Sequence, residues 1–414
     1  MEHPSIFAYA LLWIFCWGAV GLYVTPKIYA RKDLDVSQAG LVGAAIGGAG
    51  GPILLIPLWI FTPKLNWPWV ALPGLLILLI FAVAFARADP DNFCVTNESY
   101  LTTQIVNGLV MGIIYGLMAL GLTLIFSILG VVSFAHGEFY MIGGMAVFYM
   151  SVVWFPGLNP ILSILAAALI TFLIGVTFEF IFLRAMNSGK VERPGEYAIL
   201  VTFGLAFFLQ YLMLALVGAN PKKVDRFINY PEVTIPPGAD TPIIEMSART
   251  FNFFDFISIS STRITAALIS IVLLILLMWF LNKTWLGKAL RAVSQDRQAA
   301  AVTGINPNVM NTLAFGLGGM LAGLSGASLI QVFSWVPWVG ILASARAFVI
   351  IVLGGMGSLP GAFIGGLIVG LVETVGAGCV PDPQRASAYI PAYGMVILVI
   401  VLLLKPTGLL GREL

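Results

Sequence analysis

Continuous apolar runs of about 20 residues dominate this sequence, and a helix needs about that length to cross the hydrocarbon core of a bilayer. Charged residues make up 10% of the chain, whereas soluble globular proteins carry about 25%. Hydrophobic residues make up 59%. So few charges do not cover a water-exposed surface. The sequence therefore predicts an all-α fold, a polytopic membrane helical bundle of about 10–12 segments, some of them broken or re-entrant.

The composition also excludes several classes of function. A net charge of +2, with no basic run longer than a pair, excludes nucleic-acid binding, which depends on clustered Lys and Arg. Three cysteines without a CxxC pair and only two histidines exclude a disulfide scaffold and a His-cluster metal centre. The chain also lacks a nucleophile–base pair typical of an enzyme. We therefore expect no catalytic residues, no metal ligands and no cofactor bound by this chain.

Lysine and arginine residues predict how the carboxyl-terminal part, residues 101–414, is oriented. They gather near residues 184–193, within 282–307 and at the end of the chain, and the positive-inside rule assigns such segments to the cytoplasm. The polar segment 220–263 then lies on the other side as an extracytoplasmic loop or small cap. Residues 1–100 contain three extra apolar runs without a predicted role. Their orientation stays open, because counting the membrane spans places their basic residues outside, against the positive-inside rule.

Two breaks in the apolar runs predict a substrate path. Ionisable groups at membrane depth cost about 2.5–3.5 kcal/mol on insertion scales and by default mark a functional site. A solvated cytoplasmic turn is the alternative interpretation, since glycines suit a turn equally well. The candidate residues of the first break are Ser133, Phe134, His136, Gly137 and Glu138.

The second break echoes the first, because both contain glycine, then serine, then an Ile-Gly-Gly sequence. Such interruptions at corresponding places in two halves point to a transporter's binding site, although close helix packing through small residues is the alternative. We expect backbone amides at the starts of both half-helices to bind an anionic group of the substrate, such as a carboxylate, and His136 to be a hydrogen-bonding strut. The candidate residues of the second break are Gly354, Gly355, Met356 and Ser358.

Residues 282–307 predict a short cytoplasmic helix that docks on a partner. Ala, Leu, Arg and Gln favour a helix, and Gly304 followed by Pro307 ends it. Small residues on one side and charges on the other suit a partner's groove, whereas an ordinary solvated connection is the alternative. The candidate contact residues are Arg291, Asp296, Arg297, Ala299, Ala300 and Gly304.

From about residue 102 to 411 the chain resembles the branched-chain amino-acid ABC transporter permeases. Residues 1–100 lie outside this resemblance, and residues 220–263 match it poorly. The motifs that carry it lie at residues 107–108, 115–117, 133–138 (Ser-Phe-Ala-His-Gly-Glu), 287–306, 353–362 (Leu-Gly-Gly-Met-Gly-Ser-Leu-Pro-Gly-Ala) and 405–411 (Lys-Pro-Thr-Gly-Leu-Leu-Gly).

The resemblance implies an importer in a bacterial or archaeal cell membrane. This permease would assemble with a second homologous permease, two cytoplasmic ATPase subunits and an extracytoplasmic substrate-binding protein. Residues 296–304 resemble the loop that contacts the ATPase. The sequence contains no G-x-x-x-x-G-K-[ST] phosphate loop, so we expect the partner subunits to use the ATP.

Two alternative functions stay open. One is the same machine importing urea, short amides or another small polar solute. The other is an ion-coupled secondary transporter, which would need several intramembrane carboxylates. Besides Glu138, the apolar runs contain Glu179 and Glu373, and we expect these two at the membrane interface because they lie near helix ends.

Overall fold

The structure is a computed structural model that describes residues 6–30, 39–48, 55, 94, 97–187, 191–235, 243–253, 257–379, 386–405 and 407–411. The chain divides into two compact units, one of residues 1–101 with 403–406 and one of residues 102–402 with 407–414. In the smaller unit, helix α1 (Ile6–Ala30) packs on a short helix, Ala39–Gly48. A Cβ atom on Gly21 would lie 1.8 Å from the carbonyl oxygen of Gly43, so the two backbones touch. Two of the three extra apolar runs in residues 1–100, those at 36–61 and 67–86, lie mostly outside the described residues.

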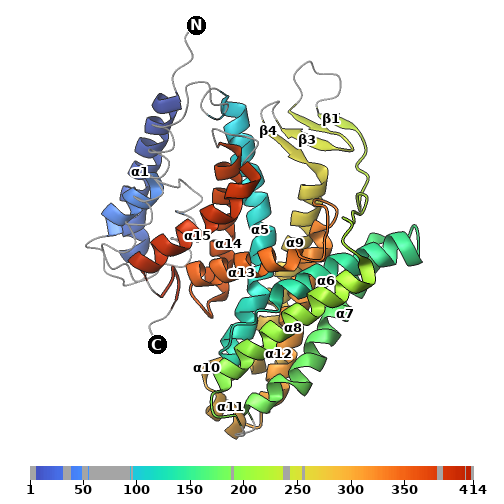
Figure 1. The fold of residues 1–414 in the computed structure, drawn as a ribbon. Coiled ribbons are helices and arrows are strands. Elements are labelled where there is room, and N and C mark those ends of the chain that lie inside the picture. Colours follow the sequence, from blue (N-terminus) through green and yellow to red (C-terminus); the bar gives the residue numbers. More distant parts are fainter. Residues whose placement is uncertain are drawn as a thin grey trace. The chain divides into compact units, whose positions relative to one another are not determined.

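Helices make up most of the larger unit (Figure 1). Six of the described helices are long and apolar enough to cross a membrane, namely α5, α7, α8, α9, α12 and α14, and the predicted helical membrane bundle is thereby confirmed. The helices are α5 (Glu98–Leu129), α6 (His136–Phe148), α7 (Pro160–Ile181), α8 (Pro194–Val217), α9 (Ser261–Lys283), α10 (Trp285–Gln295), α11 (Arg297–Val302), α12 (Pro307–Leu329), α13 (Val339–Gly354), α14 (Leu359–Gly378) and α15 (Ala386–Leu404). A π-helical turn, η1 (Tyr149–Trp154), continues α6, and a 3-10 turn, η2 (Leu183–Asn187), follows α7.

Helix α12 forms the centre of this unit and packs on α6 and α7. Its contact with α6 runs through glycines, because a Cβ atom on Gly143 would lie 2.0 Å from the carbonyl oxygen of Gly323. A Cβ atom on Gly326 would lie 1.9 Å from the carbonyl oxygen of Tyr140. Small residues let helix backbones approach closely enough for extensive van der Waals contact, which drives helix association inside a membrane.

A four-stranded antiparallel sheet in order β1-β2-β3-β4 occupies most of the predicted small cap. The sequence analysis predicted no strands there, because each is only three or four residues long. The strands are β1 (Val233–Ile235), β2 (Ile244–Met246), β3 (Thr250–Phe253) and β4 (Ile257–Ser260). Strand β4 leads directly into α9, whose other end leads into α10 and α11. The sheet and the predicted docking helices therefore lie at opposite ends of α9 (Figure 1).

Both predicted helix breaks are present. Gly130 has a φ of +72° between α5 and α6, and Gly355 has a φ of +103° between α13 and α14, a backbone conformation that favours glycine. The amides of Leu409 and Leu410 donate to the carbonyls of Leu353 and Gly354, both at 2.9 Å. The carboxyl-terminal segment thus satisfies carbonyls at the end of α13 that have no partner within the helix.

Helix α13 is longer than its apolar run. That run covers only residues 347–353, whereas the helix begins at Val339 and has 16 residues. The polar residues Ser344 and Arg346 interrupt the apolar pattern in the first half of this helix. Both residues have partners inside the protein, and these partners define the candidate site described next.

Candidate functional site

A cavity of about 460 Å³ lies beside the first helix break, among residues of α5, α6, α8, α13 and α15. Its volume falls within the range of small-molecule sites, about 300–1,000 Å³. Most of its lining is apolar: Leu122, Val132, Phe134, Phe203, Ala206, Phe207, Ile341, Ala345, Phe348 and Met395. Four polar residues complete the lining: Ser133, Glu138, Gln210 and Ser344. Phe134 stands edge-to-face to Phe203, with ring centroids 6.0 Å apart.

Two polar groups of the cavity lack partners. The Oγ atom of Ser133 and the Oε2 atom of Glu138 are buried and have no hydrogen-bond partner among the described residues. The two residues are only 1% and 2% exposed. A buried polar atom without a partner costs about 1–3 kcal/mol, and native proteins contain few of them. These two atoms are therefore the groups of the cavity most in need of a ligand.

His136 does not line the cavity. Its side chain is fully buried, and its Nε2 atom lies 2.9 Å from the carbonyl oxygen of Met118 on α5. Because a carbonyl oxygen only accepts, Nε2 carries the proton in this hydrogen bond. His136 thus connects the start of α6 to the middle of α5, which is the strut role that the sequence predicted.

The amides at the start of α6 already have partners. The Gly137 amide donates to Ser344 Oγ at 2.8 Å, and the Glu138 amide donates to the carbonyl of Ala135 at 3.0 Å. The Ser344 hydroxyl in turn donates to the carbonyl of Phe134 at 3.1 Å. The prediction that these amides bind a substrate carboxylate is wrong for α6, because the amides of Gly137 and Glu138 already donate to Ser344 and Ala135.

Gly137 and Gly340 make this contact between α6 and α13 possible. A Cβ atom on Gly137 would lie 1.9 Å from the carbonyl oxygen of Gly340, and one on Gly340 would lie 2.6 Å from the carboxyl carbon of Glu138. A side chain at Gly137 would separate the helices, whereas a methyl group at Gly340 would displace the Glu138 carboxylate. Substitution of Gly137 therefore disturbs helix packing before it can report on a substrate path.

The structure does not bring the second break to this cavity, since none of its four candidate residues lines it. A Cβ atom on Gly354 would lie 2.2 Å from the carbonyl oxygen of Gly361, and one on Gly355 would lie 2.2 Å from the amide nitrogen of Gly411. Ser358 caps α14 by accepting a hydrogen bond from the Gly361 amide at 3.2 Å. Met356 is 48% exposed. The geometry of this segment matches the alternative of close packing through small residues.

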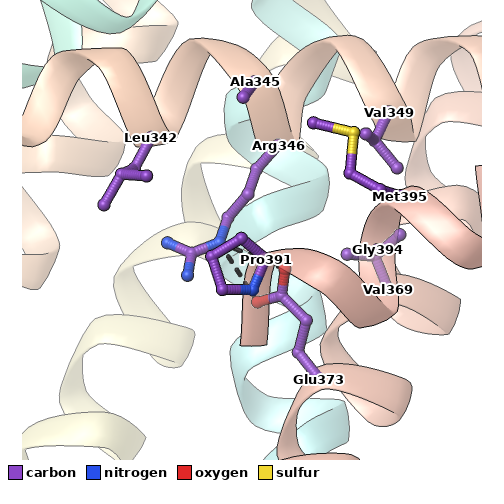
Figure 2. A pocket seen from close by; sticks show the side chains of 9 residues that line it. All are labelled: Leu342, Ala345, Arg346, Val349, Val369, Glu373, Pro391, Gly394 and Met395. Atoms are coloured by element: carbon purple, nitrogen blue, oxygen red, sulfur yellow. Dashed lines mark hydrogen bonds and ion pairs between the residues drawn. The ribbon is translucent and has the colours of Figure 1, made fainter. Parts of the chain in front are cut away.

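An ion pair that the sequence analysis missed lies next to the cavity (Figure 2). The Arg346 Nε atom on α13 lies 3.1 Å from Glu373 Oε2 on α14, and the side chains are 26% and 4% exposed. The guanidinium carbon lies 5.4 Å from the ring centroid of Tyr115 on α5. Met395 of α15 lies beside the pair and also lines the cavity. The available signal was a single arginine inside an otherwise apolar run.

Glu179 is also buried. Its side chain on α7 is fully shielded from solvent and accepts a hydrogen bond from the hydroxyl of Thr312 on α12. Glu179 and Glu373 were predicted to lie at the membrane interface; the structure shows that both side chains are buried and have partners inside the protein. Their positions near helix ends did not reveal those partners, which lie more than 20 residues away in sequence.

The predicted docking segment forms two short helices. The Asp296 carboxylate caps α11 by accepting hydrogen bonds from the amides of Gln298 and Ala299, at 2.8 and 2.9 Å. Arg291 donates to Asn282 Oδ1 at 3.0 Å, and Gly304, at a φ of +88°, follows α11.

The candidate contact residues of this segment differ in exposure. Ala299 is exposed and Arg297 is half-buried, whereas Ala300 is only 4% exposed and is therefore not available at the surface. Val302, which the sequence analysis did not select, is 89% exposed. A surface of this segment thus includes Ala299 and Val302 in place of Ala300.

A family model described as "Branched-chain amino acid transport system / permease component" matches residues 104–405. The chain is 32% identical over 316 residues to the high-affinity branched-chain amino acid transport system permease protein BraD of Pseudomonas aeruginosa, covering 75% of this chain and 95% of that protein. It is 28% identical over 320 residues to the permease protein LivH of Escherichia coli, covering 76% and 96%.

A more distant relative comes from an archaeon. The chain is 26% identical over 299 residues to the probable branched-chain amino acid transport permease protein LivH of Methanocaldococcus jannaschii, covering 72% of this chain and 88% of that protein. No solved structure matches the chain. The matched region contains the cavity, both helix breaks and helices α10 and α11.

We expect Arg346→Met to destabilise the protein by about 3 kcal/mol, because it leaves the Glu373 carboxylate buried without its cationic partner. The double substitution Arg346→Met with Glu373→Leu should restore most of this loss. Thermal unfolding of the purified chain in detergent measures both effects. A double variant that is no more stable than Arg346→Met would contradict this explanation, because removal of the unpaired carboxylate would then bring no recovery.

Proposed function

This chain belongs to the family of branched-chain amino acid transport permeases, and from that membership we propose that it is the translocation subunit of an ATP-driven importer of branched-chain amino acids. The observation that carries the proposal is the family match over residues 104–405, which covers nearly all of the larger unit. The named relatives are branched-chain amino acid permeases, and the match covers almost their whole length.

The cavity beside the first break supports this assignment as the substrate path. Its lining suits a branched aliphatic side chain, since Phe134, Phe203 and Phe207 offer apolar surface. Burial of such a side chain contributes about 1.5–3 kcal/mol. The lining offers few hydrogen bonds, so binding there would be weak, as fast release from a translocation path requires.

The proposal includes partners that this chain needs to work. A second homologous permease would complete the path, an extracytoplasmic binding protein would deliver the substrate, and two cytoplasmic ATPase subunits would hydrolyse ATP. The sequence supports the last point, because it holds no phosphate-binding loop of its own. The complex would lie in the cell membrane of a bacterium or archaeon.

Helices α10 and α11 would transmit the motion of the ATPases. They follow α9 and contact α12, the central helix of the larger unit. A force applied at α11 would therefore reach the helices that position α6 and the cavity. Closure of the ATPases would shift the permease between two arrangements by contacting them differently. The exposed side chains of Ala299 and Val302 are the proposed contacts.

Deletion of the gene should abolish energy-dependent uptake of leucine, isoleucine and valine by the host, and expression of the intact chain should restore it. Uptake of radiolabelled amino acid into cells starved of branched-chain amino acids measures this. Uptake of urea or short amides provides the comparison. Loss of urea or amide uptake with unchanged leucine uptake would contradict the proposed cargo and favour the alternative solutes.

We expect Ala299→Glu to reduce the amount of ATPase that copurifies with the chain about tenfold, because a loss of about 1.4 kcal/mol at the contact corresponds to that factor. The unfolding temperature should not change, since Ala299 is exposed. Ala219→Glu is the matched control, because Ala219 is also exposed and follows the carboxyl-terminal end of α8, outside the proposed contact. Ala300→Glu should instead destabilise the chain by burying a charge. Equal recovery of ATPase with Ala299→Glu and Ala219→Glu would contradict this contact.

A further inference from the structure

Glu138 is the feature of the cavity that its apolar lining does not explain. The side chain is 2% exposed, and its Oε2 atom has no hydrogen-bond partner among the described residues. Glycine at position 340 leaves room for the carboxylate, since a Cβ atom there would lie 2.6 Å from Oε1 and 2.7 Å from Oε2. The carboxylate therefore rests against the backbone of α13 at the edge of the cavity.

None of the described residues that line the cavity carries a positive charge that would neutralise this carboxylate. The other polar residues of the lining, Ser133, Gln210 and Ser344, are neutral. The nearest arginine along α13, Arg346, is already paired with Glu373. His136, two residues away on α6, is bonded to the carbonyl of Met118. A buried carboxylate without a partner is strongly disfavoured, so the charged form of Glu138 needs a cation that the cavity admits.

We propose that Glu138 binds the ammonium group of the transported solute, and that the cavity selects primary ammonium ions with a short branched aliphatic body. This inference rests on the proposed function, because it specifies which group of an amino acid the path recognises. The ammonium group donates a charge-assisted hydrogen bond to Oε2. The unpartnered hydroxyl of Ser133 accepts a second hydrogen bond from the same group, and Phe203 and Phe207 contact the aliphatic body.

The carboxylate of the solute is not recognised at the start of α6. The Gly137 and Glu138 amides are bonded to Ser344 and Ala135, so this end of the helix offers no free donor from either residue. An aliphatic acid without an amino group would in addition meet the negative charge of Glu138. The cavity should therefore distinguish an amine from an acid that has the same hydrocarbon skeleton.

Thermal unfolding of the purified full-length chain in detergent tests this directly. The probe is 3-methylbutylammonium, and the comparison probe is 4-methylpentanoate. A ligand that binds only the folded state raises the unfolding temperature, and we expect a rise of about 2 °C with the ammonium probe and none with the acid. Glu138→Gln should abolish the rise. Glu196→Gln, at a carboxylate whose side chain is 65% exposed, should retain it.

A rise that is equal in Glu138→Gln and in the unaltered chain, a rise with the acid, or no rise in the unaltered chain would each overturn the proposal. Should Glu138→Gln not fold, Gly340→Ala takes its place, because its methyl group displaces the carboxylate. An undiminished rise in that variant likewise overturns it. Failure of the proposed function is a separate result: leucine uptake independent of this chain, with the ammonium-specific rise intact, leaves the Glu138 site valid for another amine.

Discussion

Close contact between helix backbones at glycines is the constraint on which the rest of this structure depends. Gly143 meets Gly323 of α12, and Gly137 meets Gly340 of α13, at separations that exclude even a methyl group. These contacts fix the short helix α6 between α12 and α13. With α6 fixed, the break after α5 is held open, and the residues before and within the first turn of α6 reach the cavity. Inside a membrane, such contacts replace the hydrophobic effect as the force that holds helices together.

The buried polar groups of the larger unit follow from the same constraint, and they divide into two kinds. Some bond one helix to another: His136 with Met118, Arg346 with Glu373, and Glu179 with Thr312. Others remain without a partner in the cavity, above all Glu138. Contacts between helices fix the relative positions of those helices, whereas an unpartnered group that lines the cavity is available to a solute. This division separates the residues that build the path from the one proposed to recognise what passes through it.

The sequence predicted the helical bundle, both breaks and helical structure within residues 282–307, because apolar length, glycine and capping residues act locally along the chain. It did not predict which polar residues meet across the bundle. Ser344 accepts a hydrogen bond from the amide of Gly137, although the two residues are more than 200 positions apart in sequence. Arg346 pairs with a carboxylate that was expected at the membrane interface. The exposure of Ala299 and the burial of Ala300 depend on where α11 packs, which composition does not determine. The second break looked like the first in sequence but packs against the carboxyl-terminal segment and away from the cavity.

Labelling of single cysteines with a small polar thiol reagent tests most directly whether the cavity at the first break is the substrate path. Ser133→Cys would be compared with Ser358→Cys of the second break, both in a Cys16→Ala background, because Cys16 is a free thiol. Labelling would be followed in the assembled transporter with and without ATP. The account predicts that the thiol at position 133 is modified in at least one state of the cycle and that leucine slows its modification. Modification at position 358 that leucine slows, with none at position 133 in any state, would contradict it.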